Sequence, residues 1–277
     1  MNVGIVGLGL IGASMARTIH LHTDCKVWGT DLSEEVMREA VLTETIDAPL
    51  NDSLLRRCEL VLVALYPGEV IRWVERHADC FAEGCTVIDC GGIKQRIVSA
   101  LQPLADTKGW HFIGGHPMAG REFSGIKYAR DDLFDNASMI LTPSEHEDPA
   151  VCQRAKEFFL DLGFRRVQFT TPLEHDEMIA YTSQLAHVVS SAYVKCPLAS
   201  KHRGFSAGSF ADMTRVARLN EDMWTELFLD NRDALLPEVS GLIERLTAYR
   251  DALEAQNAEQ LRALLREGRE IKEQLSE

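Results

Sequence analysis

Short apolar runs alternate with helical segments through the first 170 residues, and this alternation restricts the fold to a small set of architectures. The runs cover residues 3–6, 26–30, 60–65, 86–89, 112–114, 138–141 and 167–169. The run 60–65 is apolar at every position, which is typical of a central parallel strand that is buried on both faces. Strands that alternate with helices predict an α/β domain, in which helices cover both faces of a parallel sheet.

The chain changes character after Thr171. Thr171, Pro172 and Glu174 match a helix start, with an N-cap, a proline at the first helical position and an acid at the third. No convincing strand follows, and apolar residues recur three or four apart over 235–253 and 261–275. We therefore predict two domains, an α/β domain at 1–171 and an all-α helical domain at 172–277. The apolar seams of the second domain either pack within one bundle or join two copies in a homodimer.

Composition excludes several classes of protein. The 277 residues include 42 acidic and 29 basic side chains, a net charge of −13 that disfavours nucleic-acid binding. No apolar run approaches the ~18–20 residues that a membrane span needs, and the first residues lack the basic region of a signal peptide. The seven cysteines form no C-x-x-C motif, so we expect reduced thiols in a cytoplasmic protein without a metal site.

A glycine-rich turn marks a candidate nucleotide site. The run Gly7-Leu8-Gly9-Leu10-Ile11-Gly12 follows the first predicted strand and opens the first predicted helix. Such glycines permit a tight turn, close approach of a pyrophosphate and close helix–strand packing, and the helix N-terminus favours phosphate. Asp31 lies 19 residues after Gly12, where a carboxylate binds the adenosine ribose and repels a 2′-phosphate. The sequence thus predicts a Rossmann-type domain for NAD; a flavin nucleotide and a turn that serves packing alone are the alternatives.

Further candidates lie where later strands end, because ligands of such sheets bind at the carboxyl edge. Leu65, Tyr66 and Pro67 end the run 60–65 and are candidates for the nicotinamide side, although Pro67 is equally expected as an ordinary strand terminator. Gly92 and Lys94 follow the run 86–89, and His116 follows the next run. We expect Gly92, Lys94 and His116 to converge, with His116 as a general base; a structural histidine is the alternative.

The helical half adds a polar stripe and an acid–base pair. The stripe consists of Ser183, Gln184, His187 and Ser191. If the helix is buried, these side chains need polar partners or line a water-filled cleft; the alternative is that they face solvent. Asp212 and Arg215 are three residues apart and therefore share a helix face. A guanidinium held by an acid can clamp a substrate carboxylate. The alternative is a surface ion pair of little energetic value.

Several segments together resemble the prephenate dehydrogenase family, in order and over nearly the whole chain. They are Gly7–Gly12, Asp89–Lys94, 116–125, 182–187, 210–217, 222–224 and 231–232. The patterns H-P-M-x-G-x-E-x-S-G and D-x-T-R-[IV]-A are the specific ones. The resemblance implies oxidative decarboxylation of prephenate, or of its transaminated form arogenate, on the route to tyrosine.

The resemblance also implies roles for individual residues. His116 resembles the catalytic histidine that bonds the substrate's 4-hydroxyl, and Arg215, with Asp212 beside it, resembles the arginine that recognises a substrate carboxylate. His187 matches a substrate-side histidine, and Glu122 matches a glutamate of the gating and ion-pair network. Trp224 matches an aromatic residue that shapes the pocket. The chain departs from the family at three positions, with Gly92 for serine, Gln184 for histidine and Ala186 for proline.

Two other functions remain open at this stage. A β-hydroxyacid dehydrogenase would share the architecture, but it needs a catalytic lysine on a helix of the second domain, and Lys195 is a poor match. A catalytically silent NAD-sensing module would keep the nucleotide site without turnover, and Gly92 leaves that reading open. The sequence does not distinguish prephenate from arogenate as the substrate.

Overall fold

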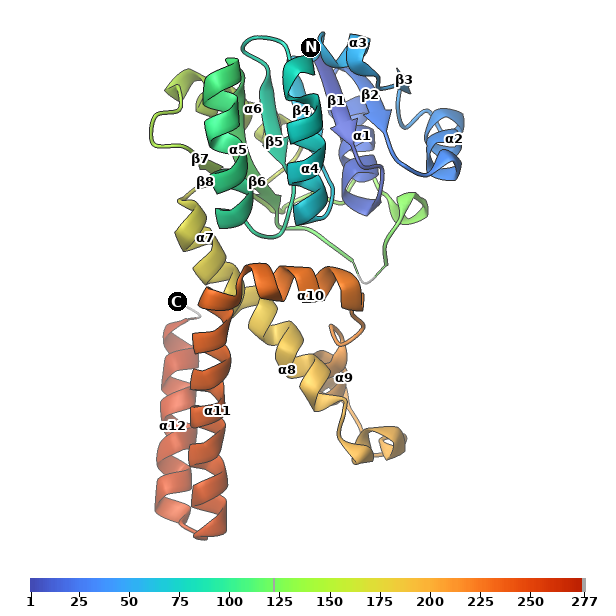
Figure 1. The fold of residues 1–277 in the computed structure, drawn as a ribbon. Helices are drawn as coiled ribbons and strands as arrows, with labels where there is room; N and C mark the ends of the chain where they lie inside the picture. The colour runs from blue at the N-terminus through green and yellow to red at the C-terminus, as the bar shows by residue number, and fades with distance from the viewer. Residues whose placement is uncertain (122, 276–277) are drawn as a thin grey trace. The chain divides into compact units, whose positions relative to one another are not determined.

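The structure is a computed structural model that describes residues 1–121 and 123–275. It divides into two compact units, Met1–Asn231 and Arg232–Glu277. The first unit contains the whole sheet and every helix up to residue 231 (Figure 1). Our division of the chain after Thr171 was based on composition, and it stays a prediction.

The first unit is built on one eight-stranded sheet. Its strands are β1 (Asn2–Val6), β2 (Lys26–Thr30), β3 (Ala48–Pro49), β4 (Leu60–Val63), β5 (Thr86–Asp89), β6 (His111–Pro117), β7 (Ser138–Pro143) and β8 (Arg166–Phe169). They lie in the order β3-β2-β1-β4-β5-β6-β7-β8. Each predicted run forms a strand, and the short β3 is an addition that the sequence did not indicate.

The sheet is parallel except where β7 pairs with β6. The predicted parallel sheet therefore contains one antiparallel pair. A parallel return needs a crossover, usually a helix, whereas the connection from β6 to β7 contains the short 3₁₀ turn Ile126–Tyr128 and no α-helix in its described part. The chain accordingly returns antiparallel, and β8 resumes the parallel pairing beside β7 after a crossover helix.

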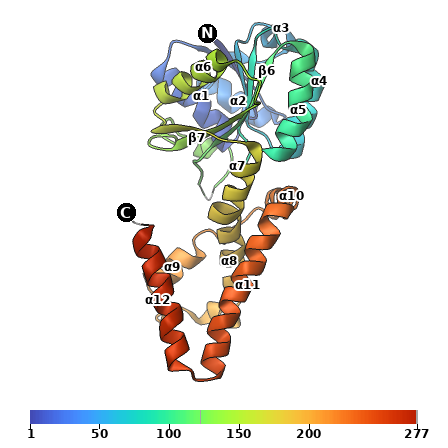
Figure 2. The same cartoon turned by 90° about the vertical axis from the view of Figure 1, so that its left-hand side faces the viewer.

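Helices cover both faces of the sheet (Figure 2). α1 (Leu10–His22), α2 (Glu34–Leu42) and α6 (Pro149–Asp161) contribute to one buried cluster, and α4 (Pro67–His77) and α5 (Gln95–Lys108) to another. The short α3 (Asp52–Leu55) joins the second cluster. Neighbouring residues of β4 point to opposite clusters, with Leu62 in the first and Val63 in the second. This confirms that the central strands are buried on both faces.

A helical segment follows the sheet within the first unit. α7 (Pro172–Ile179) passes through the π-helical turn Ala180–Gln184 into α8 (Leu185–Tyr193), and α9 (Gly208–Thr214) and α10 (Glu221–Asp230) follow. The predicted helix start is confirmed, since the Thr171 hydroxyl accepts the backbone N–H of Glu174 at 3.2 Å. No strand occurs after β8 in the described part of the chain. This agrees with the predicted change to all-helical structure.

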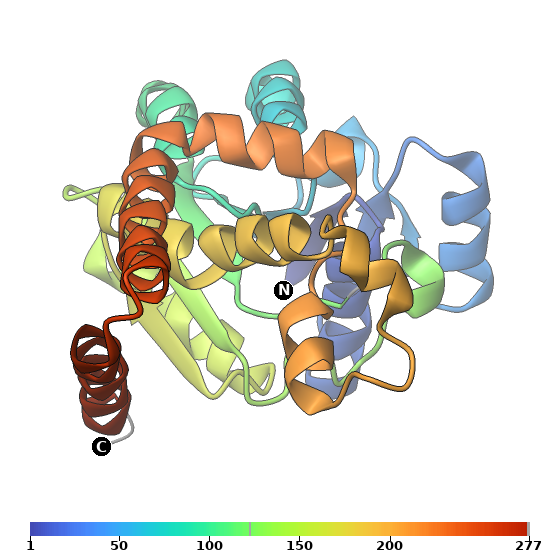
Figure 3. The ribbon, with the colours of Figure 1, turned by 90° about the horizontal axis from the view of Figure 1, so that it is seen from below.

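Helix α10 is attached to the carboxyl edge of the sheet. The Glu226 carboxylate accepts the backbone N–H of Gly68, at the start of α4, at 2.7 Å. Arg96 of α5 donates to Asp230, the last residue of α10. In Figure 3, α8 (gold) and α10 (orange) run alongside each other. These contacts bring side chains of the helical segment to the sheet edge where ligands bind in folds of this type.

The second unit is a pair of helices, α11 (Arg232–Glu254) and α12 (Ala258–Gln274). The Asn257 side chain caps α12 by accepting the N–H of Gln260 at 3.0 Å, and the Tyr249 hydroxyl donates to the carbonyl of Leu264 at 3.2 Å. Part of the predicted apolar seam is exposed, namely Leu246, Leu253, Ile271 and Leu275, whereas Leu235 is buried; Leu236, Ile243 and Leu265, outside the seam, are exposed as well. Among the described residues, no helix is both long and apolar enough to cross a membrane.

Replacing Gly12 by alanine is expected to destabilise the protein by about 1–3 kcal/mol. A Cβ at Gly12 would lie 1.9 Å from the Gly7 carbonyl oxygen, so the turn before α1 must move. This strain outweighs the ~1 kcal/mol that alanine gains over glycine inside a helix. Chemical denaturation monitored by circular dichroism measures the change.

Gly268→Ala is the matched control. Gly268 lies inside α12 with no atom within 4 Å of an added Cβ. The same substitution is therefore expected to leave the protein equally stable or to stabilise it by about 0.5–1 kcal/mol. Equal effects of the two substitutions would contradict the packing role assigned to Gly12.

Candidate functional site

The glycine run forms an open turn between β1 and α1. Gly7 has a φ of +87°, and its N–H donates to the carbonyl of Thr30 at 2.8 Å. A Cβ on Gly7 would lie 2.4 Å from the Ala64 carbonyl oxygen, whereas one on Gly9 would meet no atom within 4 Å. The Gly9 backbone is thus open to a ligand at the point where Leu10 and Ile11 begin α1. These residues fit a pyrophosphate group at a helix N-terminus.

Asp31 lies next to this turn at the end of β2. One of its carboxylate oxygens accepts the N–H of Leu8 at 2.8 Å, and the other accepts the N–H of Ser33 at 2.9 Å. These contacts hold the carboxylate beside the glycine turn. Because a carboxylate has about four acceptor positions, it can still bind ribose hydroxyls. The position of Asp31 fits the predicted adenosine-binding role.

The segment after β4 begins a helix. Pro67 is the first residue of α4, and Tyr66 precedes it as the N-cap with 48% of its surface exposed. The β4 strand ends at Val63, so Pro67 opens α4 and does not terminate the strand directly. The Leu65 side chain would lie 2.7 Å from a Cβ on Gly7 and is therefore beside the glycine turn. A nicotinamide role for Leu65, Tyr66 and Pro67 stays a prediction.

A buried ion pair ties the carboxyl ends of β5 and β6 together. The Asp89 and Lys94 side chains are both fully buried. The Lys94 ammonium donates to the Asp89 carboxylate and, at 2.6 Å, to the Gly115 carbonyl. Asp89 also accepts the N–H groups of Gly91 and Gly115 at 2.8 and 3.1 Å. Lys94 thus contacts the residue before His116, and a direct catalytic part for Lys94 stays a prediction.

His116 is the partly exposed histidine at the end of β6, and it contacts a second histidine that sequence reasoning missed. His116 Nδ1 lies 2.9 Å from His175 Nε2, and the two rings meet edge-on. His175 Nδ1 lies 2.7 Å from the Asp176 carboxylate. Burial lowers the pKa of both histidines, and the neighbouring His175 and Lys94 lower the pKa of His116 further. Both imidazoles are therefore neutral near pH 7.

Asp176 anchors this pair to the start of α5. Its carboxylate accepts the backbone N–H groups of Lys94 and Gln95 at 2.7 and 2.8 Å, besides its contact with His175. The Asp176 carbonyl accepts the side-chain amide of Asn231 at 2.8 Å. In the sequence, His175 and Asp176 are visible only as a His-Asp pair shortly after the helix start at Thr171. Their role depends on the packing of α7 against α5, which the sequence does not show.

In the polar stripe of the helical segment, Gln184 is buried, whereas Ser183, His187 and Ser191 are partly exposed. Gln184 is buried, donates to the Leu227 carbonyl at 3.0 Å and accepts from Asn231 at 2.8 Å. This residue therefore follows the interpretation in which the stripe is buried and finds polar partners.

Gly92 lies close to α10, because a Cβ on it would be 3.4 Å from the Leu227 side chain. The position at which the resembling family has serine is thus lined by an apolar side chain.

His187, Arg215 and Trp224 come together on the helical side. The His187 ring stacks on Trp224, with 3.9 Å between ring centroids, and its Nδ1 lies 2.8 Å from the Ser183 carbonyl. Burial lowers the pKa of His187, the Ser183 carbonyl opposes this, and the Arg215 charge lowers the pKa further. Arg215 directly follows α9, and Asp212 is exposed one turn earlier. Glu122 lies outside the described residues.

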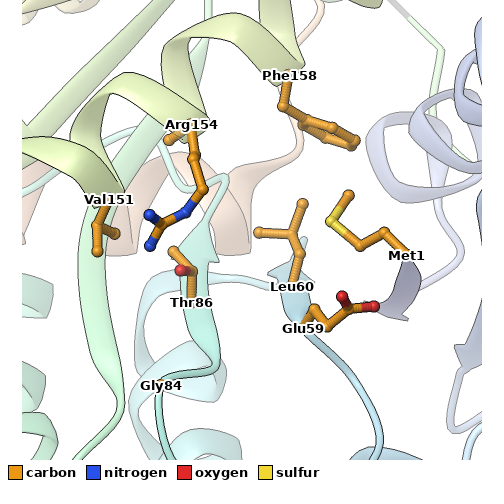
Figure 4. Close-up of a pocket in the computed structure, with 9 residues that line it drawn as sticks. Met1, Glu59, Leu60, Gly84, Thr86, Val151, Arg154 and Phe158 are labelled. Carbon is orange, nitrogen blue, oxygen red and sulfur yellow. The ribbon is translucent and has the colours of Figure 1, made fainter.

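A hollow lies at the opposite edge of the sheet, around the amino ends of β4 and β5 (Figure 4). It has a volume of about 280 Å³, and its lining includes Glu59, Thr86, Arg154 and Phe158. None of the sequence-predicted site residues lines it. The carboxyl edge, where the glycine turn and His116 lie, is therefore the candidate active site.

Two family models match this chain and together cover most of it. The model described as "Prephenate dehydrogenase, nucleotide-binding domain" matches residues 15–168. The model described as "Prephenate dehydrogenase, dimerization domain" matches residues 171–267.

Curated relatives and solved structures agree with these matches. A prephenate dehydrogenase of Bacillus subtilis is 30% identical over 266 residues, which are 93% of this chain and 71% of that protein. The prephenate dehydrogenase from A. aeolicus, in complex with hydroxyphenyl propionate and NAD+, superposes with a TM-score of 0.85 at 27% identity, covering 99% of this chain and 98% of that one. The Synechocystis arogenate dehydrogenase gives 0.84 at 26% identity, covering 99% and 100%.

Replacing Lys94 by methionine is expected to destabilise the protein by about 3–5 kcal/mol. The substitution leaves the buried Asp89 carboxylate without its cation, and an uncompensated charge is costly in the interior. Adding Asp89→Asn to the variant is expected to recover part of the loss, because the remaining side chain is neutral. Chemical denaturation of the single and double variants measures both effects.

Lys108→Met provides the control, since Lys108 pairs with Asp79 at the surface. Solvent screens this pair, so its loss is expected to leave stability unchanged. If Lys94→Met were as mild as Lys108→Met, the buried pair would not hold β5 and β6 together.

Proposed function

The chain belongs to the prephenate dehydrogenase family, and we propose that it catalyses the NAD-dependent oxidative decarboxylation of prephenate to 4-hydroxyphenylpyruvate in tyrosine biosynthesis. The observation that carries this proposal is the position of His116. This neutral histidine lies at the carboxyl end of β6, in the nucleotide-binding domain, and is held by His175. A neutral imidazole at that edge is suited to take a proton from a substrate hydroxyl.

The glycine turn and Asp31 support NAD as the cofactor. The open backbone at Gly9 accommodates the pyrophosphate, and the Asp31 carboxylate beside Leu8 accepts ribose hydroxyls. A 2′-phosphate at the same place would be repelled by that carboxylate. NAD, when bound, accepts the hydride that C4 of the substrate loses. The relative from A. aeolicus was crystallised with NAD+.

The chemistry assigned to the side chains follows from the substrate, a cyclohexadienol with a 4-hydroxyl and a ring carboxylate. His116 takes the hydroxyl proton as C4 is oxidised to a ring ketone. The carboxylate leaves as CO₂, and its electron pair enters the ring, which becomes aromatic. His116 can then return its proton to the phenolic oxygen. Arg215 binds a substrate carboxylate, Asp212 supports it, and His187 and Trp224 form the wall beside it.

The quaternary structure we propose is a cytoplasmic homodimer formed through the helical domain. The match to a dimerization domain covers residues 171–267. Exposed Leu236, Ile243 and Leu246 leave apolar surface on α11 that a second copy would cover. Association through such side chains removes apolar surface from water, which is the main driving force of stable interfaces.

Steady-state assays with prephenate and arogenate, each with NAD+ and NADP+, test the proposal. We expect turnover of prephenate with NAD+, because the substrate carries both the 4-hydroxyl assigned to His116 and a carboxylate of the kind assigned to Arg215. Turnover of arogenate alone would identify an arogenate dehydrogenase. Nucleotide binding without turnover of either compound would favour a silent sensing module. Turnover of a β-hydroxyacid instead would favour the rival dehydrogenase class, although Lys195 is exposed after α8.

Arg215→Ala is expected to raise KM for the substrate about tenfold or more, with a smaller effect on kcat, because a charge-assisted contact to the substrate carboxylate is worth ~1.5–3 kcal/mol. The Kd for NAD+, measured by fluorescence titration, should not change. Arg218→Ala is the control, since Arg218 is exposed and lies three residues further along the chain, outside any helix. Equal KM values for the two variants would remove Arg215 from substrate binding.

A further inference from the structure

Three side chains form a continuous hydrogen-bonded line from α7 to β6. The Asp176 carboxylate contacts His175 Nδ1 at 2.7 Å, and His175 Nε2 contacts His116 Nδ1 at 2.9 Å. The His175 and Asp176 side chains are 0% and 2% exposed, so water does not compete for these contacts. His116, at the end of the line, is partly exposed.

The fixed donors at one end of the line determine where each proton lies. Asp176 accepts the backbone N–H groups of Lys94 and Gln95, which cannot act as acceptors. An ionised carboxylate only accepts, so its contact with His175 requires a proton on His175 Nδ1. A neutral His175 then has a bare Nε2, which must accept from His116 Nδ1. A neutral His116 is therefore protonated at Nδ1 and bare at Nε2.

We propose that His175 and Asp176 are positioning residues that hold His116 in the tautomer with a bare Nε2, the nitrogen that takes the substrate's hydroxyl proton. The inference rests on the proposed function for the role of that nitrogen, but the tautomer itself is a property of the free protein. Gly92 brings no hydroxyl to this site, and His175 is the side chain that bonds the His116 ring. The line also places a negative charge behind the proton acceptor.

The pH behaviour follows from the groups that face His116. His175 contacts it from α7, and the Lys94 charge acts on it from the turn before α5; the Asp89 and Asp176 carboxylates act on His175. Burial lowers the pKa of His116 and His175. Activity should therefore be lost only as pH falls below the ~6.5 of a free imidazole. The acidic limb of the pH–rate profile is the range in which kcat falls as the pH is lowered. Because the two histidines are in contact, this limb reports on the titration of the pair and not of one residue.

Nitrogen-15 NMR of the histidine side chains in the free protein tests the tautomer directly. His116→Gln, which removes one ring, assigns the His116 signals. We expect a protonated-type signal for His116 Nδ1 and an unprotonated-type signal for Nε2 at pH 7. The reverse pattern would overturn the proposal, whether or not the protein is an active dehydrogenase.

Two substitutions at His175 separate positioning from packing. His175→Phe fills the space but offers no acceptor, so the His116 tautomer should become mixed and kcat should fall about 10²-fold, with KM and NAD+ affinity unchanged. His175→Gln can donate to Asp176 and accept from His116, so it should restore the tautomer and most of the rate. If the phenylalanine variant does not fold, the wild-type and glutamine spectra still decide. Equal rates in both folded variants would contradict the positioning role.

Asp176→Asn keeps an acceptor but removes the charge. The acidic limb of kcat should then shift to lower pH, because the protonated imidazole loses a stabilising carboxylate. An unshifted limb would remove Asp176 from the proposal. His111→Gln is the control, since His111 lies at the other end of β6 and also bonds a carboxylate, Glu147, at 2.8 Å. It should change neither the tautomer of His116 nor the limb.

The two readouts distinguish failure of the inference from failure of the proposed function. A bare His116 Nε2 without turnover of prephenate or arogenate would leave the hydrogen-bonded line intact and refute the assigned reaction. Turnover of prephenate with His116 protonated at Nε2 would support the reaction and refute the role of His175 and Asp176.

Discussion

The Asp176 carboxylate is the group on which the arrangement of the candidate site depends. It accepts N–H groups from the start of α5 and contacts His175, so it joins α7 to the sheet and to the histidine pair at once. A buried carboxylate is tolerated only when its oxygens are hydrogen-bonded, and here backbone donors supply that requirement. The orientation of His116 is thus tied to the backbone of another element and not to a mobile side chain.

The glycines before His116 bring β6 close enough for this arrangement. A Cβ on Gly114 would lie 2.3 Å from the Thr142 hydroxyl, and one on Gly115 would lie 2.4 Å from the Asp89 carbonyl. The absence of side chains lets β6 pack tightly against β5 and β7, and it lets Lys94 reach the Gly115 carbonyl. The contact between Lys94 and the β6 backbone therefore depends on these two glycines.

The acidic surface and the anionic substrate of the proposed reaction are compatible because the attraction is local. At a net charge of −13 the long-range field does not favour an anion. Charges separated by more than about 8–10 Å are screened at physiological salt, so a guanidinium at the site acts on a bound carboxylate almost independently of the distant surface. His187, whose pKa is lowered by burial and by Arg215, adds no competing charge near neutral pH.

The sequence by itself determined the strands, the helix start at Thr171 and the glycine turn, because apolar periodicity, capping and glycine conformation act over a few neighbouring residues. It also led to His116 through the end of a predicted strand. Only the tertiary structure decided that β7 runs antiparallel, that Gln184 is buried against Asn231, and that His175 and Asp176 support His116. Each of these depends on contacts between residues far apart in the chain; His116 and His175 are 59 positions apart, and local patterns do not encode such distances.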